Sequence, residues 1–295
     1  MDLKKYEVLL KVIERGSINN VSYDMGYSNS GVSKMLNSME TELGFQIVKR
    51  NNKGIVLTSE GQLLVDRIRR LLAENEKLEE EIAQIKGLET GKIRIGCFPT
   101  IAFALMPEII RNFSEKYPHI EIEVLEENDI ERLEQWLNQG IIDIAAFSRH
   151  QRHPYDWIRE FDDMYVALLP KRHPLTLYNI VPLEKMFDYK MILFKSHKGL
   201  DQDIVQILQY KDVEGHAGYT VNSDFTAIRM VAENNCVALV PELIARHGVE
   251  MFNVEYRPVD VCLNRNIGFA LKNKNELSPS MRKFVKCLKE EDIEL

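Results

Sequence analysis

The sequence lacks the features that mark a membrane-spanning or secreted protein. No stretch of its 295 residues approaches the ~18 consecutive apolar residues of a membrane span. The first segment, MDLKKYEVLL, carries charges in place of an apolar signal sequence. Its four cysteines, at positions 97, 236, 262 and 287, form no CxxC or zinc-binding spacing, as expected for thiols in a reducing compartment. We therefore expect a cytoplasmic location and no membrane partner.

The common motifs of catalysis and of nucleotide or zinc binding are missing as well. GxSxG, GxGxxG, GxxxxGK[ST] and HExxH do not occur, so no motif argues for a hydrolase, a phosphate-binding loop or a zinc protease. The one dense histidine cluster holds His150 and His153 without nearby Cys or carboxylate ligands, which favours a solvated loop over a metal site. We expect no enzyme activity, no metal and no cofactor.

An excess of basic residues is also absent. Lys and Arg number 38 against 45 Asp and Glu, for a net charge of −7, so any contact with nucleic acid must come from a local surface. Hydrophobic residues make up 45% of the chain, which at this length is enough for two or three packed domains.

The first 44 residues predict three short helices. Apolar residues at helical spacing indicate one helix that ends at Gly16 and a second that begins after Ser17 and ends at Gly26. The third begins poorly, because its first turn consists of small polar residues: Ser28, Asn29, Ser30 and Gly31. Two short helices joined by a tight glycine-containing turn are typical of a helix-turn-helix.

A role in DNA binding explains the poor start of the third helix. A helix that enters the major groove points its first turn at bases and phosphates, where short polar side chains are useful. Ser28 is then the N-cap, Asn29 pairs with adenine, and Ser33 and Lys34 follow in the next turn. The alternative is a plain capped helix whose polar residues face water, and the helix by itself leaves both open.

The segment 45–58, FQIVKRNNKGIVLT, predicts two short strands around a tight Asn/Gly turn. Such a hairpin beside a helix-turn-helix is a wing. Between residues 28 and 58 four cations stand against two carboxylates, a local charge of +2, and three of the four lie at the wing: Lys49, Arg50 and Lys53. Phosphate contacts are expected there.

A long helix is predicted from 59 to 87, with no Pro or Gly between Gly61 and Gly87. Its apolar seam advances in steps of four and three residues, the pattern of a dimeric coiled coil with one polar Asn. The seam consists of Leu64, Ile68, Leu71, Asn75, Leu78, Ile82 and Ile85. The alternative, a helix packed on its own domain, is less favoured because most of the remaining circumference is charged.

Strands alternating with helices follow, which predicts an α/β domain with parallel strands. A first set has strands at 92–98, 120–126 and 142–148 and helices near 101–116 and 129–139. A second set has strands at 164–170, 191–194, 219–221 and 236–241 and helices near 201–210 and 224–234. A last strand at 266–272 and a helix at 278–290 return to the first sheet. The order predicts two lobes that form a cleft.

These segments together resemble the LysR-type transcriptional regulators. The closest match is in residues 1–88, in MDL, ERGSI (14–18), YSNSGVSKMLNSMETELGFQIVKR (27–50) and LTSEG (57–61). A looser match follows in KIRIG, IDIAAF, HPL (173–175) and VALVP (237–241). The resemblance implies a winged helix-turn-helix domain at 1–58, a dimerising linker helix at 59–90 and an effector domain at 91–295 that is similar to periplasmic binding proteins. Its lobe I is expected at about 91–161 and 266–295, and lobe II at about 162–265.

The chain departs from the family at three places. Val21-Ser22 replaces an Ala pair, and Asn29-Ser30 replaces Gln-Pro after the N-cap serine, so the operator sequence cannot be inherited. Asn234-Asn235-Cys236 replaces a Gly-rich turn, and Asn tolerates the left-handed conformation that such a turn needs.

The resemblance also assigns site residues by position. DNA contacts fall on Ser28, Asn29, Ser30, Ser33, Lys34, Arg50 and Lys53. The effector site falls on strand and helix ends: Pro99, Thr100, Ile101, Ser148, Arg149, Ser196, Gly199, Asn222 and Asp224. We expect Arg149, Thr100 and Ser196 to hold an anion such as a small carboxylate, although Arg149 as a solvated rim charge is an equal alternative. For Cys97, an inert buried thiol is favoured over a redox switch.

The predicted function is a sequence-specific regulator of transcription, controlled by a small, anionic metabolite. Its expected partners are double-stranded promoter DNA, the effector, a second copy in a homodimer or homotetramer, and RNA polymerase. The alternative is a cytoplasmic small-molecule-binding protein or enzyme that uses the same two lobes. That alternative gives residues 1–61 no role and leaves the basic wing and the heptad helix unexplained.

Overall fold

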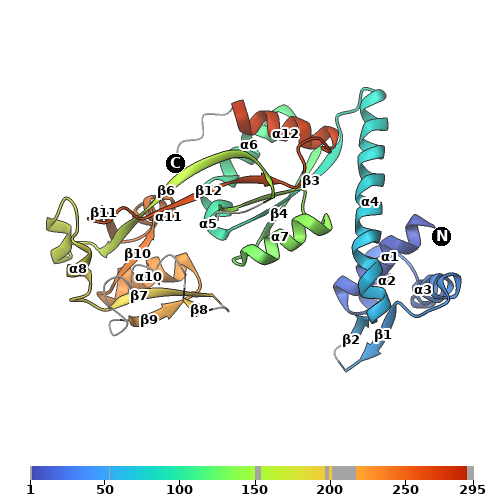
Figure 1. The fold of residues 1–295 in the computed structure, drawn as a ribbon, viewed down its shortest axis with the longest axis horizontal. Coiled ribbons are helices and arrows are strands. Elements are labelled where there is room, and N and C mark those ends of the chain that lie inside the picture. The colour runs from blue at the N-terminus through green and yellow to red at the C-terminus, as the bar shows by residue number, and fades with distance from the viewer. Residues whose placement is uncertain (1, 53, 150–153, 197–198, 201–216, 291–295) are drawn as a thin grey trace. The chain divides into compact units, whose positions relative to one another are not determined.

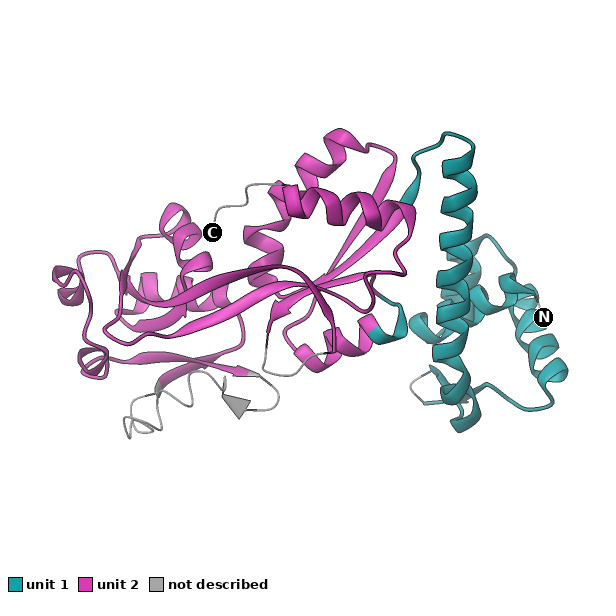
Figure 2. Cartoon of the chain, turned by 45° about the horizontal axis from the view of Figure 1, so that its top comes forward, with its two compact units in different colours: residues 1–91, 138–141 teal, residues 92–137, 142–295 magenta. Residues whose placement is uncertain are grey.

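The structure is a computed structural model that describes residues 2–52, 54–149, 154–196, 199–200 and 217–290 (Figure 1). The chain forms two compact units, residues 1–91 with 138–141 and residues 92–137 with 142–295 (Figure 2). Among the described residues, no helix combines the length and the apolar character needed to cross a bilayer.

The first unit begins with the three predicted helices, α1 (Leu3–Arg15), α2 (Ile18–Met25) and α3 (Asn29–Leu43). Gly16 and Gly26 end the first two helices in the left-handed conformation, which glycine adopts without steric cost. Ser17 precedes α2 as predicted, but its side chain makes no capping hydrogen bond. The apolar faces of the three helices form one core around Val8, Leu9, Val12, Val21, Val32, Leu36 and Met39.

The predicted wing is an antiparallel pair of β1 (Val48–Asn51) and β2 (Gly54–Leu57). The Ile55 N–H donates to the Gly16 carbonyl at 2.9 Å, which ties the wing to the end of α1. At Gly54, a Cβ would lie 2.5 Å from the Gly16 oxygen, and φ is +110°. Only glycine fits this turn without strain.

Helix α4 (Ser59–Ile85) starts at Thr58, whose hydroxyl accepts from the Gly61 N–H at 3.0 Å. Its first half packs into the core of the helix-turn-helix, where Val65 and Ile68 are buried. Its second half is different, because the apolar side chains of Leu78, Ile82 and Ile85 are exposed.

The second unit begins with strands β3 (Gly91–Cys97), β4 (Ile120–Glu126) and β5 (Ile144–Ser148). β3 and β5 are parallel, as predicted. Helices α6 (Met106–Lys116) and α12 (Pro279–Glu290) lie over one face of this sheet and α7 (Ile130–Gln139) over the other (Figure 1). The single helix expected at 101–116 is two helices, since α5 (Pro99–Ala104) ends before Leu105 and Pro107 lacks the N–H that a continuous helix needs.

The rest of this unit is built on β7 (Met191–Ser196), β8 (Gly199–Leu200), β9 (Ala217–Val221), β10 (Val237–Pro241) and β11 (Val254–Pro258). Helices α10 (Asp224–Asn234) and α11 (Glu242–Met251) and the short η1 (Pro174–Leu177) and α8 (Leu183–Met186) complete it. Sequence patterns missed α8, α11, β11 and η1. The turn after α10 is confirmed as left-handed, because Asn235 has φ +47°. The helix expected at 201–210 lies outside the described residues.

Two long crossing strands, β6 (Asp156–Pro170) and β12 (Asn264–Leu271), join the strands of both lobes into one continuous sheet, in the order β4-β3-β5-β12-β6-β10-β7-β8. β6 starts eight residues before the strand predicted at 164–170, because the charged stretch DWIREFDD conceals its beginning. The first part of β6 pairs with β12 and its last part pairs with β10 and β11. These strands belong to both lobes, and their side chains lie where the two lobes meet.

Candidate functional site

The first turn of α3 presents its small polar residues to solvent. Ser28 caps the helix by accepting from the Gly31 N–H at 3.1 Å, as predicted. The side chains of Asn29, Ser30 and Lys34 are exposed. Val32, Leu36 and Met39 on the opposite side of α3 are buried in the core. The helix therefore has an anchored apolar face and a free polar start, the arrangement that a recognition helix requires.

Asn29 has a partner that sequence reasoning did not identify. The Ser22 hydroxyl oxygen lies 2.5 Å from Asn29 Oδ1 and 2.8 Å from the Asn19 carbonyl oxygen. A serine hydroxyl has one proton and can donate to only one of these oxygens. At 2.5 Å, the contact between Ser22 and Asn29 is within the range of an O–H···O hydrogen bond but is too short for an N–H···O bond. The Ser22 hydroxyl therefore donates to Asn29 Oδ1, and the Asn19 carbonyl oxygen is a second acceptor within its reach.

This arrangement fixes how Asn29 presents its amide. With Oδ1 toward Ser22, the second lone pair of Oδ1 and the NH₂ group remain, which is the acceptor and donor pair that matches an adenine edge. Ser22 itself is buried on α2. Both residues occupy positions at which the chain departs from the LysR pattern, and the structure brings these two departures into contact.

The wing carries exposed cations. Lys49 and Arg50 are exposed on β1. Lys53, the third predicted phosphate contact of the wing, lies outside the described residues. Ser33 is only half-buried on α3.

The predicted seam of α4 divides into two parts. Leu64 and Ile68 pack against the core of the helix-turn-helix, so the alternative of packing on its own domain holds for this half. Leu71, Leu78, Ile82 and Ile85 are 48%, 55%, 41% and 86% exposed. Asn75 lies within the exposed part, between Leu71 and Leu78, and donates to Glu79 at 2.9 Å.

In the second unit, the first turn of α5 places Thr100 against a buried ion pair. The Thr100 hydroxyl accepts from Arg265 Nη2 at 3.3 Å. Arg265 on β12 also donates from Nε and Nη2 to Asp163 on β6, at 2.8 and 2.7 Å. The second oxygen of Asp163 accepts from the Leu243 N–H in the first turn of α11 at 3.0 Å. This network joins elements of both lobes at the crossing strands.

The charge of Arg265 depends on this pairing. Burial lowers the pKa of Arg265, but the Asp163 carboxylate beside it raises the pKa above the ordinary value. The pair escaped sequence reasoning because Asp163 and Arg265 are far apart in the chain. Only the register that sets them opposite each other brings them together.

Arg149 lies on the other side of the crossing strands. One nitrogen of its guanidinium, Nη1, donates to both oxygens of Glu160, at 2.7 and 2.6 Å. Glu160 and Asp163 point to opposite faces of β6, because side chains alternate along a strand. Arg149 and Thr100 therefore contact opposite faces. The structure does not bring these two predicted anion-binding residues together.

The other predicted effector residues lie at the expected strand and helix ends. Pro99 and Ile101 share the first turn of α5, and Ser148 is buried at the end of β5. Asn222 precedes α10, in which Asp224 is the first residue. Ser196 and Gly199 pair across β7 and β8, and their side-chain surroundings lie outside the part that the structure describes.

Cys97 and His173, which the sequence analysis also named, have structural surroundings. Cys97 is buried, and burial raises the pKa of its thiol to about 12, so the reactive thiolate is strongly disfavoured. His173 in the HPL segment caps η1, since its Nδ1 accepts from the Leu175 N–H at 3.3 Å. Burial lowers the pKa of His173.

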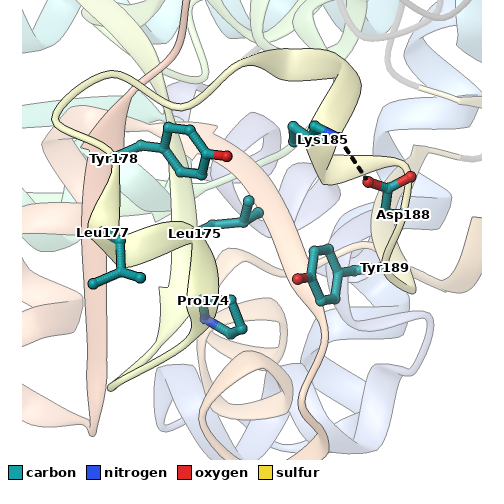
Figure 3. Close-up of a pocket in the computed structure, with 7 residues that line it drawn as sticks. All are labelled: Pro174, Leu175, Leu177, Tyr178, Lys185, Asp188 and Tyr189. Atoms are coloured by element: carbon teal, nitrogen blue, oxygen red, sulfur yellow. Dashed lines mark ion pairs between the residues drawn. The ribbon is translucent and has the colours of Figure 1, made fainter.

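A surface pocket of the second lobe lies next to this histidine. Tyr178 and Tyr189 frame it, and Lys185 and Asp188 form an ion pair of 3.7 Å at its edge (Figure 3). Pro174, Leu175 and Leu177 complete its lining. None of the predicted effector residues lines this pocket.

Comparison with known families gives matches along most of the chain. Residues 3–62 match the family described as "Bacterial regulatory helix-turn-helix protein, lysR family". Residues 86–292 match the "LysR substrate binding domain". Among curated proteins, the chain is 26% identical over 291 residues to the uncharacterized HTH-type transcriptional regulator YvbU of Bacillus subtilis, covering 98% of each chain.

Solved structures with this fold include two regulators. A full-length OxyR variant from Pseudomonas aeruginosa has a TM-score of 0.72 and 21% identity, covering 98% of this chain and 95% of that one. Full-length CbnR in complex with its target DNA has a TM-score of 0.70 and 16% identity, covering 98% and 99%. At these identities the likeness concerns the fold.

Proposed function

Because the chain belongs to the LysR family of bacterial transcriptional regulators, we propose that it reads promoter DNA with the first turn of α3. The wing supplies phosphate contacts, and a small molecule with a carboxylate group, bound in the second unit, controls the response. In this proposal the protein acts in the cytoplasm as a homodimer or homotetramer.

One observation carries the DNA-binding part of the proposal. The first turn of α3 is small, polar and exposed, while the next turns of the same helix are anchored in the core. A recognition helix contacts bases with its N-terminal residues, and Ser22 holds the amide of Asn29 in an orientation suited to adenine. A plain surface helix would need no such fixed amide.

The proposed phosphate contacts are Lys34, Arg50 and Lys53, and the proposed partners of bases or nearby backbone are Ser28, Asn29, Ser30 and Ser33. Lys34 and Arg50 are exposed, and phosphate contacts supply affinity that falls with salt. The proposed dimer contact is the exposed half of α4, from Leu71 to Ile85, since an apolar stripe on a charged helix is normally covered by a partner.

A mobility-shift experiment tests the proposal. The full chain is mixed with the DNA upstream of its own gene and with shuffled DNA of the same composition, at low and moderate salt. We expect a discrete complex on the upstream DNA that survives the higher salt, and only weak, salt-sensitive binding to the shuffled DNA. Absence of a complex at low salt, with a folded protein, would contradict the proposal.

A further inference from the structure

The crossing strands carry a polar face that no sequence pattern singled out. β6 pairs with β12 so that Asn266 lies opposite Asp162, and side chains two residues apart on a strand share a face. Arg149 joins this face through its ion pair with Glu160. The crossing face, as we call it, consists of Arg149, Glu160, Asp162, Asn264 and Asn266.

On the crossing face, two acceptor oxygens receive no hydrogen bond from the residues that the structure describes. The amides of Asn264 and Asn266 donate to the same oxygen of Asp162, Oδ1, at 2.8 and 3.3 Å. Within the described residues, Oδ2 of Asp162 accepts no hydrogen bond. The Oδ1 atom of Asn266 is buried and also lacks a partner. Asp162 is exposed, so its Oδ2 is available to a ligand that donates hydrogen bonds here.

The donor side of the crossing face is Arg149. Its Nη1 serves both Glu160 oxygens, and the guanidinium lies over the Trp157 ring, 5.6 Å from the centroid. Its Nε and Nη2 have no partner among the residues that the structure describes. These two nitrogens are the edge of a guanidinium that binds a carboxylate with two parallel hydrogen bonds.

Glycine at position 268 is needed for this arrangement. A Cβ there would lie 3.0 Å from Trp157 Cε3, 3.1 Å from Glu160 Cγ and 2.6 Å from the Arg159 carbonyl oxygen. The bare backbone of Gly268 leaves the space that Trp157 and Glu160 occupy beneath Arg149.

The charges of the crossing face select the class of ligand. The face has one positive and two negative side chains, so a simple carboxylate would meet Arg149 but leave Asp162 uncompensated beside it. Glu160 and Asp162 are two strand positions apart, about 7 Å. A ligand that carries a carboxylate and an ammonium group close together compensates both Arg149 and Asp162.

We propose that the crossing face binds the effector and that the effector is an α-amino acid or a close zwitterionic relative. Its carboxylate binds Arg149, and its ammonium group donates to Asp162 Oδ2. This inference rests on the proposed function, because it takes the second unit to be the one that senses an effector.

Thermal melting of the full chain tests this inference. Each of the twenty common amino acids is added at about 10 mM, and every amino acid that stabilises the protein is compared with its des-amino acid and with its decarboxylated amine. A ligand that binds only the native state raises the melting temperature. We expect at least one amino acid to raise it by roughly 2–4 °C, and neither analogue to do so.

Two variants locate the effect. Asp162→Asn removes the ammonium partner from an exposed position and is expected to abolish the shift. Asp188→Asn, at another exposed carboxylate of the same unit, is expected to keep it. A panel without any stabilising amino acid, a shift that survives in Asp162→Asn, or an equal shift from either analogue overturns the inference. Promoter binding is measured in parallel, because the proposed DNA binding requires no amino acid. A protein that binds its promoter but is stabilised by no amino acid would therefore overturn this inference and leave the proposed function intact.

Discussion

At the residue scale, Ser22 has a role that its type and position would not suggest. It is a buried polar residue on the supporting helix, and its hydroxyl connects the Asn19 carbonyl to the amide of Asn29. Asn29 alone could rotate freely at the exposed start of α3. The pair therefore explains how a short, exposed side chain gives a defined hydrogen-bond pattern to a base.

Ser22→Ala is expected to weaken binding to the preferred site about fivefold, because a net hydrogen bond contributes about 1 kcal/mol. Binding to shuffled DNA should not change. Fluorescence anisotropy with the two DNAs measures both affinities, and the double variant Ser22→Ala/Asn29→Ala should bind no more weakly than Asn29→Ala alone. Additive losses would mean that Ser22 acts independently of Asn29.

The buried Arg265 and Asp163 pair leads to a prediction about stability. Asp163→Ala leaves a buried guanidinium without its carboxylate and the Leu243 N–H without its acceptor. We expect a loss of about 3–5 kcal/mol in the free energy of unfolding, measured by urea denaturation. Glu108→Ala, which removes an exposed partner of Arg111, is the control and should cost less than about 1 kcal/mol.

At the element scale, the two halves of α4 perform different tasks. Apolar periodicity alone assigned all seven seam positions to one interface. The structure shows that Leu64 and Ile68 pack on their own domain, because the helix-turn-helix core needs a fourth helix to cover it. The exposed half, from Leu71 onward, remains the proposed dimer contact.

Substitutions in the two halves should therefore have separable effects. Ile82→Glu is expected to shift the protein toward the monomer in sedimentation velocity without lowering its unfolding free energy per chain, because Ile82 is exposed on α4. Ile68→Ala is expected to cost about 2–5 kcal/mol in stability. A dimer that is unaffected by Ile82→Glu would place the interface elsewhere.

The wing gives a prediction about salt. Arg50→Ala should weaken binding to preferred and shuffled DNA alike, and should reduce the slope of log affinity against log salt by about 1. Glu60→Ala, at an exposed acidic position after the wing, is the control and should not reduce the slope. An Arg50→Ala variant with an unchanged slope would mean that Arg50 contacts no phosphate.

At the scale of the whole molecule, sequence patterns predicted the order of domains and most strands, because hydrophobic periodicity and glycine turns are local signals. They missed α11 and the first half of β6, where charged residues such as Arg159 and Glu160 interrupt the apolar pattern. They also placed Arg149 with Thr100, since both follow strand ends. Strand register, which no local pattern contains, puts the two residues on opposite faces and creates the contacts of Asp163 and Asp162.

The central claim is that the first turn of α3 reads bases, and the affinity ratio between preferred and shuffled DNA for Asn29→Ala tests it most directly. The preferred site is selected from random DNA with the unaltered protein, and both affinities are measured at one salt concentration. We predict that the variant loses about 1–3 kcal/mol on the preferred site and retains its affinity for shuffled DNA, so that the ratio falls. Equal losses on both DNAs would contradict the claim.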